Sequence, residues 1–206
     1  MKKLNNTTDV VKYLKFGNLT QPFLKDEYVL EMVMRHYYAK IKLYGKANQL
    51  ESLYLLINHN VKYSKNQEFR DNYKFQRTAE EIWASKQMTG CTDYCILFAT
   101  LARQIGISTT FLHTAEKYWL QKFKNNETFK YHSGHSFCEC FYKGKWILVD
   151  PTCKKIQTNY DSNNIQLNYN VGGKDNFIPY IRDLDLSTKQ SISEHNKIMD
   201  ELCLKI

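Results

Sequence analysis

Apolar residues in the first part of the chain recur at helical spacing. They do so over 26–44 and again over roughly 47–59, and both segments predict amphipathic helices. A third, short helix is predicted near 78–87, because Thr78 and Glu81 form the pattern of a capping box at its start. The N-terminal part of the chain, 1–77, is therefore expected to be mainly helical.

The most apolar helix candidate covers residues 91–105, with the sequence CTDYCILFATLARQI. Its apolar side chains occupy much of the helix circumference, so we expect the helix to lie buried inside the core and not on its surface. Gly106 follows directly and is expected to end it. This helix begins at a cysteine.

The pattern then changes to a period of two, which is typical of strands. Strands are predicted over 109–114, 135–142 and 145–150, and Lys143-Gly144 between the last two predicts a hairpin turn. Residues 117–134, between the first two strands, read as a polar insertion that contains aromatic residues. Helices followed by antiparallel strands indicate an α+β fold.

The rest of the chain shows weaker secondary-structure patterns. Residues 153–186 read as loop-like, with Gly172-Gly173 and several asparagines, and 187–203 could close the chain with a helix. A length of 206 residues suits one domain with a sizeable core. We expect one domain over 1–206, with its motif-bearing core at about 78–156 and a C-terminal extension at 157–206.

Composition narrows the class of protein. Hydrophobic residues make up 43% and the 15 Tyr and 11 Phe argue against disorder. The net charge of +8 comes from lysines scattered through every segment, so we interpret it as solvated surface and expect no nucleic-acid partner. No signal peptide and no membrane span are predicted, which favours a cytoplasmic protein without a membrane role. The oligomeric state is not predicted.

The cysteine spacing does not favour a metal site. Without a secretion signal, reduced thiols are expected. Cys138 and Cys140 form one C-x-C pair with no matching second pair, so two small apolar side chains in a strand are a better interpretation than zinc ligands. The DSNN segment at 161–164 lacks the glycine and distal glutamate of a calcium loop. We therefore expect no metal and no cofactor.

Cys91 has the position of a nucleophile. It lies where the buried helix begins, and a helix N-terminus lowers a thiol pKa through its dipole and free N–H groups. Cys95, one turn further in, is expected to be buried and inert. Taken alone, Cys91 could equally be a structural cysteine.

The register of the predicted hairpin indicates a general base and the residue that would orient it. A two-residue turn at 143–144 pairs residues whose numbers sum to 287, which puts Phe137 opposite Asp150. His135 shares the face of Phe137, so His135 and Asp150 become diagonal neighbours within side-chain reach. An aspartate there could fix the tautomer of the imidazole. His132, in the insertion, is a rival base.

Two segments of the sequence resemble a known protein family. The segments GCTDYCILFATLARQIGI and GHSFCECFYKGKWILVDPT resemble the core of the transglutaminase-like superfamily over about 78–156. The resemblance implies a papain-like α+β core, with a buried cysteine-bearing helix packed on an antiparallel sheet. It also implies a catalytic triad of Cys91 as nucleophile, His135 as base then acid, and Asp150 as orienter. Glu139 matches a common family residue, and we expect a structural role for it, paired with Arg103 or Lys145.

The resemblance implies acyl transfer through a thioester on a protein, peptide or peptidoglycan-like amide. We expect a hydrolase, meaning a protease, isopeptidase or amidase. A glutamine cross-linking transglutaminase is the first alternative, and a non-catalytic peptide- or glycan-binding module is the second. The oxyanion would be held by the Cys91 N–H and one upstream side chain, for which Gln76, Trp83 and Gln87 are candidates.

Overall fold

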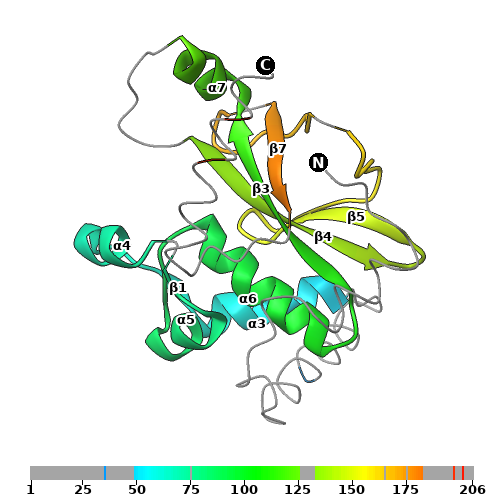
Figure 1. Ribbon diagram of the computed structural model, residues 1–206. Coiled ribbons are helices and arrows are strands. Elements are labelled where there is room, and N and C mark those ends of the chain that lie inside the picture. Colours follow the sequence, from blue (N-terminus) through cyan, green and yellow to red (C-terminus); the bar gives the residue numbers. More distant parts are fainter. Residues whose placement is uncertain are drawn as a thin grey trace.

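The computed structural model describes residues 35, 49–74, 76–125, 133–164, 166–174, 176–182, 197 and 201. The helix predicted over 26–44 lies outside this part of the chain except for Arg35, and the helix predicted over 187–203 lies outside it except for 197 and 201. Figure 1 shows the arrangement of the described elements, which form a mixed fold of helices and an antiparallel sheet.

The described helices come mostly before the sheet. They are α3 (Gln49–Asn60), α4 (Gln67–Tyr73), α5 (Ala79–Ser85), α6 (Cys91–Gln104) and α7 (Lys117–Lys124). The capping box of α5 is present, with Thr78 accepting from the Glu81 N–H and Glu81 accepting from the Thr78 N–H. Helix α4 buries none of its side chains, which is why no apolar periodicity predicted it.

Five antiparallel strands form the main sheet. They are β3 (Thr109–Glu116), β4 (Gly134–Tyr142), β5 (Lys145–Asp150), β6 (Lys155–Gln157) and β7 (Phe177–Arg182), in the spatial order β6-β5-β4-β3-β7. Two short strands, β1 (Lys62–Tyr63) and β2 (Gln87–Met88), pair in parallel beside α4 and α5. The expected α+β fold is confirmed.

The β4–β5 hairpin has the predicted register. Phe141 pairs with Trp146 and Cys138 with Val149, so the pairs sum to 287 as expected. Lys143 and Gly144 both have positive φ, 52° and 82°, which is the backbone of the two-residue turn that matches strand twist. The turn therefore decides which side chains of the two strands share a face.

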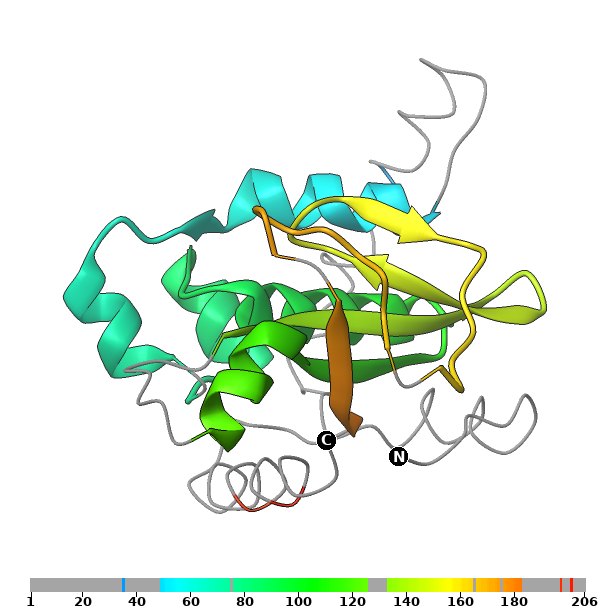
Figure 2. The ribbon, with the colours of Figure 1, turned by 90° about the horizontal axis from the view of Figure 1, so that it is seen from above.

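Both faces of the sheet are covered by apolar side chains. On one face α6 and α3 pack against Phe111, Cys138 and Val149. On the other face Leu112 and Phe137 join Phe177 and the segment that precedes β7. Helix α6 is buried along its length, from Thr92 to Arg103, as predicted, and Figure 2 shows it running beside α3 with the sheet strands crossing nearby.

Two expectations about the irregular segments were wrong. The segment 153–186 was expected to be a loop, yet it contains β6 and β7, and β7 is an edge strand paired with β3. Pro179 weakens the strand pattern there, but an edge strand tolerates a proline because one side needs no donor. The insertion 117–134 was expected to be polar with some aromatic residues and no element was predicted in it, yet it begins as α7, which buries Trp119 and Leu120.

None of the helices in the described part of the chain combines the length and the apolar character needed to cross a membrane.

Candidate active site

Cys91 is the first residue of α6 and is partly exposed, whereas Cys95 is fully buried. The loop before it is fixed by Asp93, a buried residue of the first helical turn. The Asp93 carboxylate accepts hydrogen bonds from the Thr89 N–H at 2.7 Å and the Thr89 hydroxyl at 2.8 Å, and it forms an ion pair with Arg77. The sulfur is thus held at a helix N-terminus by a rigid backbone.

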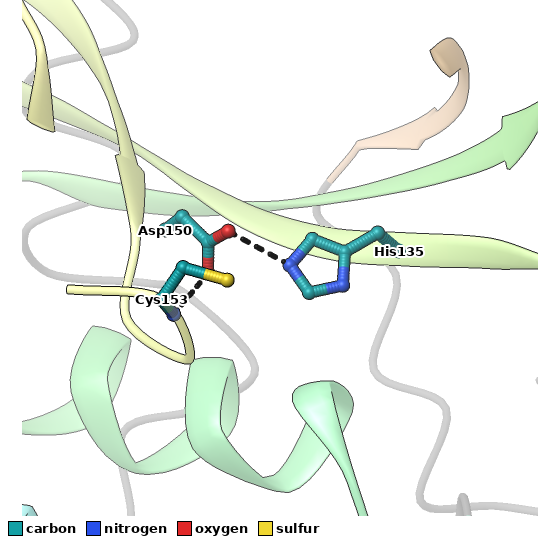
Figure 3. Close-up of side chains that lie close together, drawn as sticks. All are labelled: His135, Asp150 and Cys153. Carbon is teal, nitrogen blue, oxygen red and sulfur yellow. Dashed lines mark hydrogen bonds and ion pairs between the residues drawn. The ribbon is translucent and has the colours of Figure 1, made fainter. Parts of the chain in front are cut away.

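His135 and Asp150 lie together, as the register predicts. His135 Nε2 is 3.0 Å from Asp150 Oδ2, His135 is 7% exposed and Asp150 is fully buried. Figure 3 shows the imidazole on β4 turned toward the carboxylate at the end of β5. This contact uses Nε2, and His135 and Cys91 line the same hollow. The three side chains come from α6, β4 and β5.

The charges of Cys91 and His135 depend on each other. Burial raises the pKa of the Cys91 thiol, but the hydrogen bond and charge of His135 outweigh it, so this pKa lies below its ordinary value of 9.0. Burial also disfavours the charged His135, but its hydrogen bonds to Asp150 and Cys91 raise its pKa to about 9. Asp150 keeps a lowered pKa despite burial, because His135 and the Cys153 N–H stabilise the carboxylate. These two shifts favour the thiolate–imidazolium pair over the neutral pair.

Sequence reasoning missed a second group of polar side chains at the sulfur. Ser136 lines the same hollow as Cys91 and contributes to lowering the pKa of that thiol. The Ser136 hydroxyl is also 3.2 Å from the hydroxyl of Thr92 and 3.3 Å from His113 Nδ1. The available signal was its position two residues before Cys138, because strand alternation puts both on the face that packs against α6. His113 had no context in the sequence, because only the β3–β4 pairing brings it here.

Cys153 is the second residue that the sequence did not place. Its N–H donates to Asp150 Oδ1 at 3.0 Å, which ties the turn after β5 to the carboxylate. Ligand-type atoms of His135, Asp150 and Cys153 lie within 4.8 Å of one another, so these three residues could hold a metal ion (Figure 3). A cation there would replace the hydrogen bond between His135 and Asp150.

Two hollows meet at Gly90 and Cys91. The smaller, of about 70 Å³, also exposes His135, Ser136 and Tyr180. The larger, of about 490 Å³, is otherwise lined by Asn58, Val61, Lys62, Tyr63, Met88, Tyr94, Thr152 and Lys154. Cys91 therefore borders both hollows.

The other sequence expectations have mixed outcomes. Cys138 and Cys140 are fully buried core side chains, as interpreted. Gln76, Trp83 and Gln87 line neither of these two hollows, and the choice of an oxyanion side chain stays a prediction. The rival base His132 lies outside the described residues.

Glu139 has a different partner from those expected. It forms an ion pair with Arg182 of β7 and accepts a hydrogen bond from the Tyr160 hydroxyl. Its charged partner is therefore neither Arg103 nor Lys145. Arg103 instead donates to the carbonyl oxygen of Thr109 at 2.6 Å. Only the tertiary structure brings β7 beside this glutamate.

The site has a cysteine at the start of a buried helix and a histidine–aspartate pair on antiparallel strands. This is the arrangement of a cysteine-dependent enzyme. The family model described as the transglutaminase-like superfamily matches residues 36–151, more than half of the chain. The chain therefore belongs to the transglutaminase-like superfamily, which confirms the resemblance seen in the sequence.

Comparison with solved structures gives a similar chain in a candidate cysteine protease from Cytophaga hutchinsonii. The two share 18% sequence identity with a TM-score of 0.43, and the match covers 73% of this chain and 44% of that one. The chain thus matches less than half the length of that protein. No curated protein matches the sequence.

Proposed function

We propose that this chain is a thiol hydrolase that cleaves an amide bond through a thioester on Cys91. The Cys91 thiolate attacks the carbonyl carbon, and the C–N bond breaks as His135 gives its proton to the leaving amine. Neutral His135 then takes a proton from water, whose oxygen attacks the thioester. The C–S bond breaks, a carboxylic acid leaves, and the thiolate–imidazolium pair is restored.

The observation that carries the proposal is the pairing of His135 Nε2 with Asp150 Oδ2 at 3.0 Å in a histidine that lines the same hollow as Cys91. Asp150 accepts from the imidazole and stabilises its charged form, so its role is to orient and not to transfer a proton. The start of α6, where Cys91 lies, supplies backbone N–H donors close to the reacting carbon.

Hydrolysis is proposed in preference to cross-linking on the basis of the walls around the sulfur. A cross-linker must exclude water, which favours a passage walled by aromatic side chains. Three tyrosines line the hollows, Tyr180 the smaller one and Tyr63 and Tyr94 the larger one, but Tyr63 is itself exposed, so this wall is open to water. Cys91 itself is partly exposed, so water has access to the thioester.

The test is acylation by p-nitrophenyl pentanoate, followed by intact mass and peptide mapping. We expect one pentanoyl group on Cys91 in the wild type and none on Cys95, Cys138 or Cys140, which are buried in the core. Cys91→Ser is expected to lose turnover and to keep the circular dichroism spectrum of the wild type. Acylation at another cysteine, or equal rates in Cys91→Ser, would show that Cys91 is not the nucleophile.

The second half of the test separates the two acyl acceptors. Turnover of the pentanoyl enzyme is measured with and without a millimolar primary amine. Release of pentanoate is expected to dominate. If amide formation outruns pentanoate release at millimolar amine, the cross-linking function replaces the hydrolase.

A further inference from the structure

The larger hollow beside Cys91 has one sign of charge. Its two charged lining residues are Lys62 and Lys154, both exposed, and no carboxylate lines it. Lys62 Nζ donates to the Asn58 carbonyl oxygen, and within the described part of the chain neither ammonium has an ion-pair partner. Two uncompensated ammonium groups beside a nucleophile attract an anion.

The surroundings add to this positive potential. The first turn of α6 contributes the positive end of its dipole at Cys91, and Asp93, the acidic residue of that turn, is neutralised by Arg77. Apart from its two histidines, the smaller hollow is lined by one charged side chain, Lys74. The floor of the larger hollow is apolar, with Val61, Met88 and Tyr94, and charges act more strongly over such a surface than in open water.

The position of His135 decides which part of a substrate occupies the larger hollow. His135 lines only the smaller hollow, and the leaving amine must reach His135 to receive its proton. The leaving group therefore lies in the smaller hollow, and the acyl group lies on the other side of the sulfur. A volume of about 490 Å³ is within the range that holds a small-molecule ligand.

We propose that the acyl group of the substrate carries a carboxylate, which Lys62 and Lys154 bind in the larger hollow. This inference rests on the proposed function, because it uses Cys91 as nucleophile and His135 as acid. It names the substrate class of that site: amides of acidic acyl groups, such as those of an acidic peptide.

The test compares two esters of equal chain length, mono-p-nitrophenyl glutarate and p-nitrophenyl pentanoate. The first adds a terminal carboxylate to the acyl chain and the second is neutral. The rate constant for acylation of Cys91 is expected to favour the glutarate by about tenfold, and raised salt is expected to reduce this preference.

Matched lysine variants locate the preference. In the double variant Lys62→Gln/Lys154→Gln, the glutarate-to-pentanoate ratio is expected to fall toward one. Lys145→Gln serves as the control for charge, because Lys145 is exposed at the start of β5 and lines neither hollow. This control is expected to keep the ratio of the wild type.

The outcomes separate this inference from the function on which it rests. A ratio near one in the wild type, or a ratio unchanged in the double variant while Cys91 is still acylated, overturns the inference and leaves the hydrolase intact. Absence of Cys91-dependent acylation by either ester overturns both. A preference that the double variant loses and Lys145→Gln keeps establishes the acidic acyl site.

Discussion

At the scale of single residues, the chemistry of the site depends on the pKa values of Cys91 and His135. The hydrogen bonds of His135 to Asp150 and Cys91 overcome burial and raise its pKa to about 9, while the pKa of Cys91 falls below 9.0. The charged pair therefore exists in a window that ends at about pH 9 on the alkaline side. Below the lowered pKa of Cys91 the thiolate is lost.

This window predicts the pH dependence of amide cleavage, measured as kcat/KM on glutaryl-p-nitroanilide. We expect the rate to rise as Cys91 ionises and to fall above about pH 9, because neutral His135 cannot protonate the leaving amine. With the matching p-nitrophenyl ester the alkaline fall should be absent, because a phenolate leaves without a proton. An alkaline fall of equal size with both substrates would argue against His135 as the acid.

A second prediction compares variants of the pair. His135→Ala is expected to lower kcat/KM for the anilide by about 10²-fold or more, since it removes the group that moves the proton. Asp150→Asn is expected to lose less, because it only orients the ring, and to shift the alkaline fall to lower pH. His59→Ala, on the exposed side of α3, is the control. Activity that survives in His135→Ala and disappears in His132→Ala would make His132 the base.

At the scale of elements, the start of α6 is fixed by a buried ion pair and not by a capping side chain. Gly90 at the N-cap has no side chain to offer, and Asp93 takes over by accepting from Thr89 and Arg77. Arg77 also donates to the Ser85 hydroxyl at 2.8 Å and to the Gln87 carbonyl oxygen at 2.9 Å. The guanidinium thus joins the end of α5, strand β2 and the helix that carries Cys91.

Loss of this guanidinium should destabilise the protein and the position of the sulfur together. Arg77→Ala leaves the Asp93 carboxylate buried without its partner, and we expect a loss of about 3–5 kcal/mol in the free energy of unfolding by urea. Alkylation of Cys91 by iodoacetamide should slow in the same variant. Lys65→Ala, an exposed residue without an ion pair among the described residues, is the control. An unchanged urea midpoint would show that the pair contributes nothing.

At the scale of the whole molecule, the chain after the hairpin returns to complete the sheet. Strand β7 pairs with β3 at the edge, and Arg182 at its end reaches Glu139 on β4, with Arg182 Nη2 to Glu139 Oε1 at 2.7 Å. Glu139 is fully buried, and burial raises its pKa although Arg182 opposes this. The same strand contributes Tyr180 to the smaller hollow, so it links the edge of the sheet to the site.

A double-mutant cycle tests the coupling between Arg182 and Glu139. Arg182→Met is expected to cost about 3–5 kcal/mol in the free energy of unfolding, because the Glu139 carboxylate stays buried without its partner. Adding Glu139→Gln should restore part of that loss, since an amide is less costly to bury than a carboxylate. Strictly additive losses in the double variant would mean that the two side chains are not coupled.

Much of the site follows from local rules. Strand alternation and the Lys143-Gly144 turn are sufficient to put His135 on the same face as Asp150 as its diagonal neighbour, because a period of two leaves only one face for each residue. The apolar pattern of 91–105 is likewise sufficient to predict a buried helix with Cys91 at its start. The single-domain division of 1–206, with its core at about 78–156, stays a prediction.

The sequence by itself thus determined the α+β fold, the buried helix that begins at Cys91 and the nearness of His135 to Asp150, because each depends on spacing along a helix or across one hairpin. The tertiary structure alone decided that β7 joins the sheet, that Arg182 and not Arg103 pairs with Glu139, and that Ser136 meets Thr92 and His113. These contacts join residues far apart in the chain. No local periodicity encodes them, because they depend on how packed elements meet.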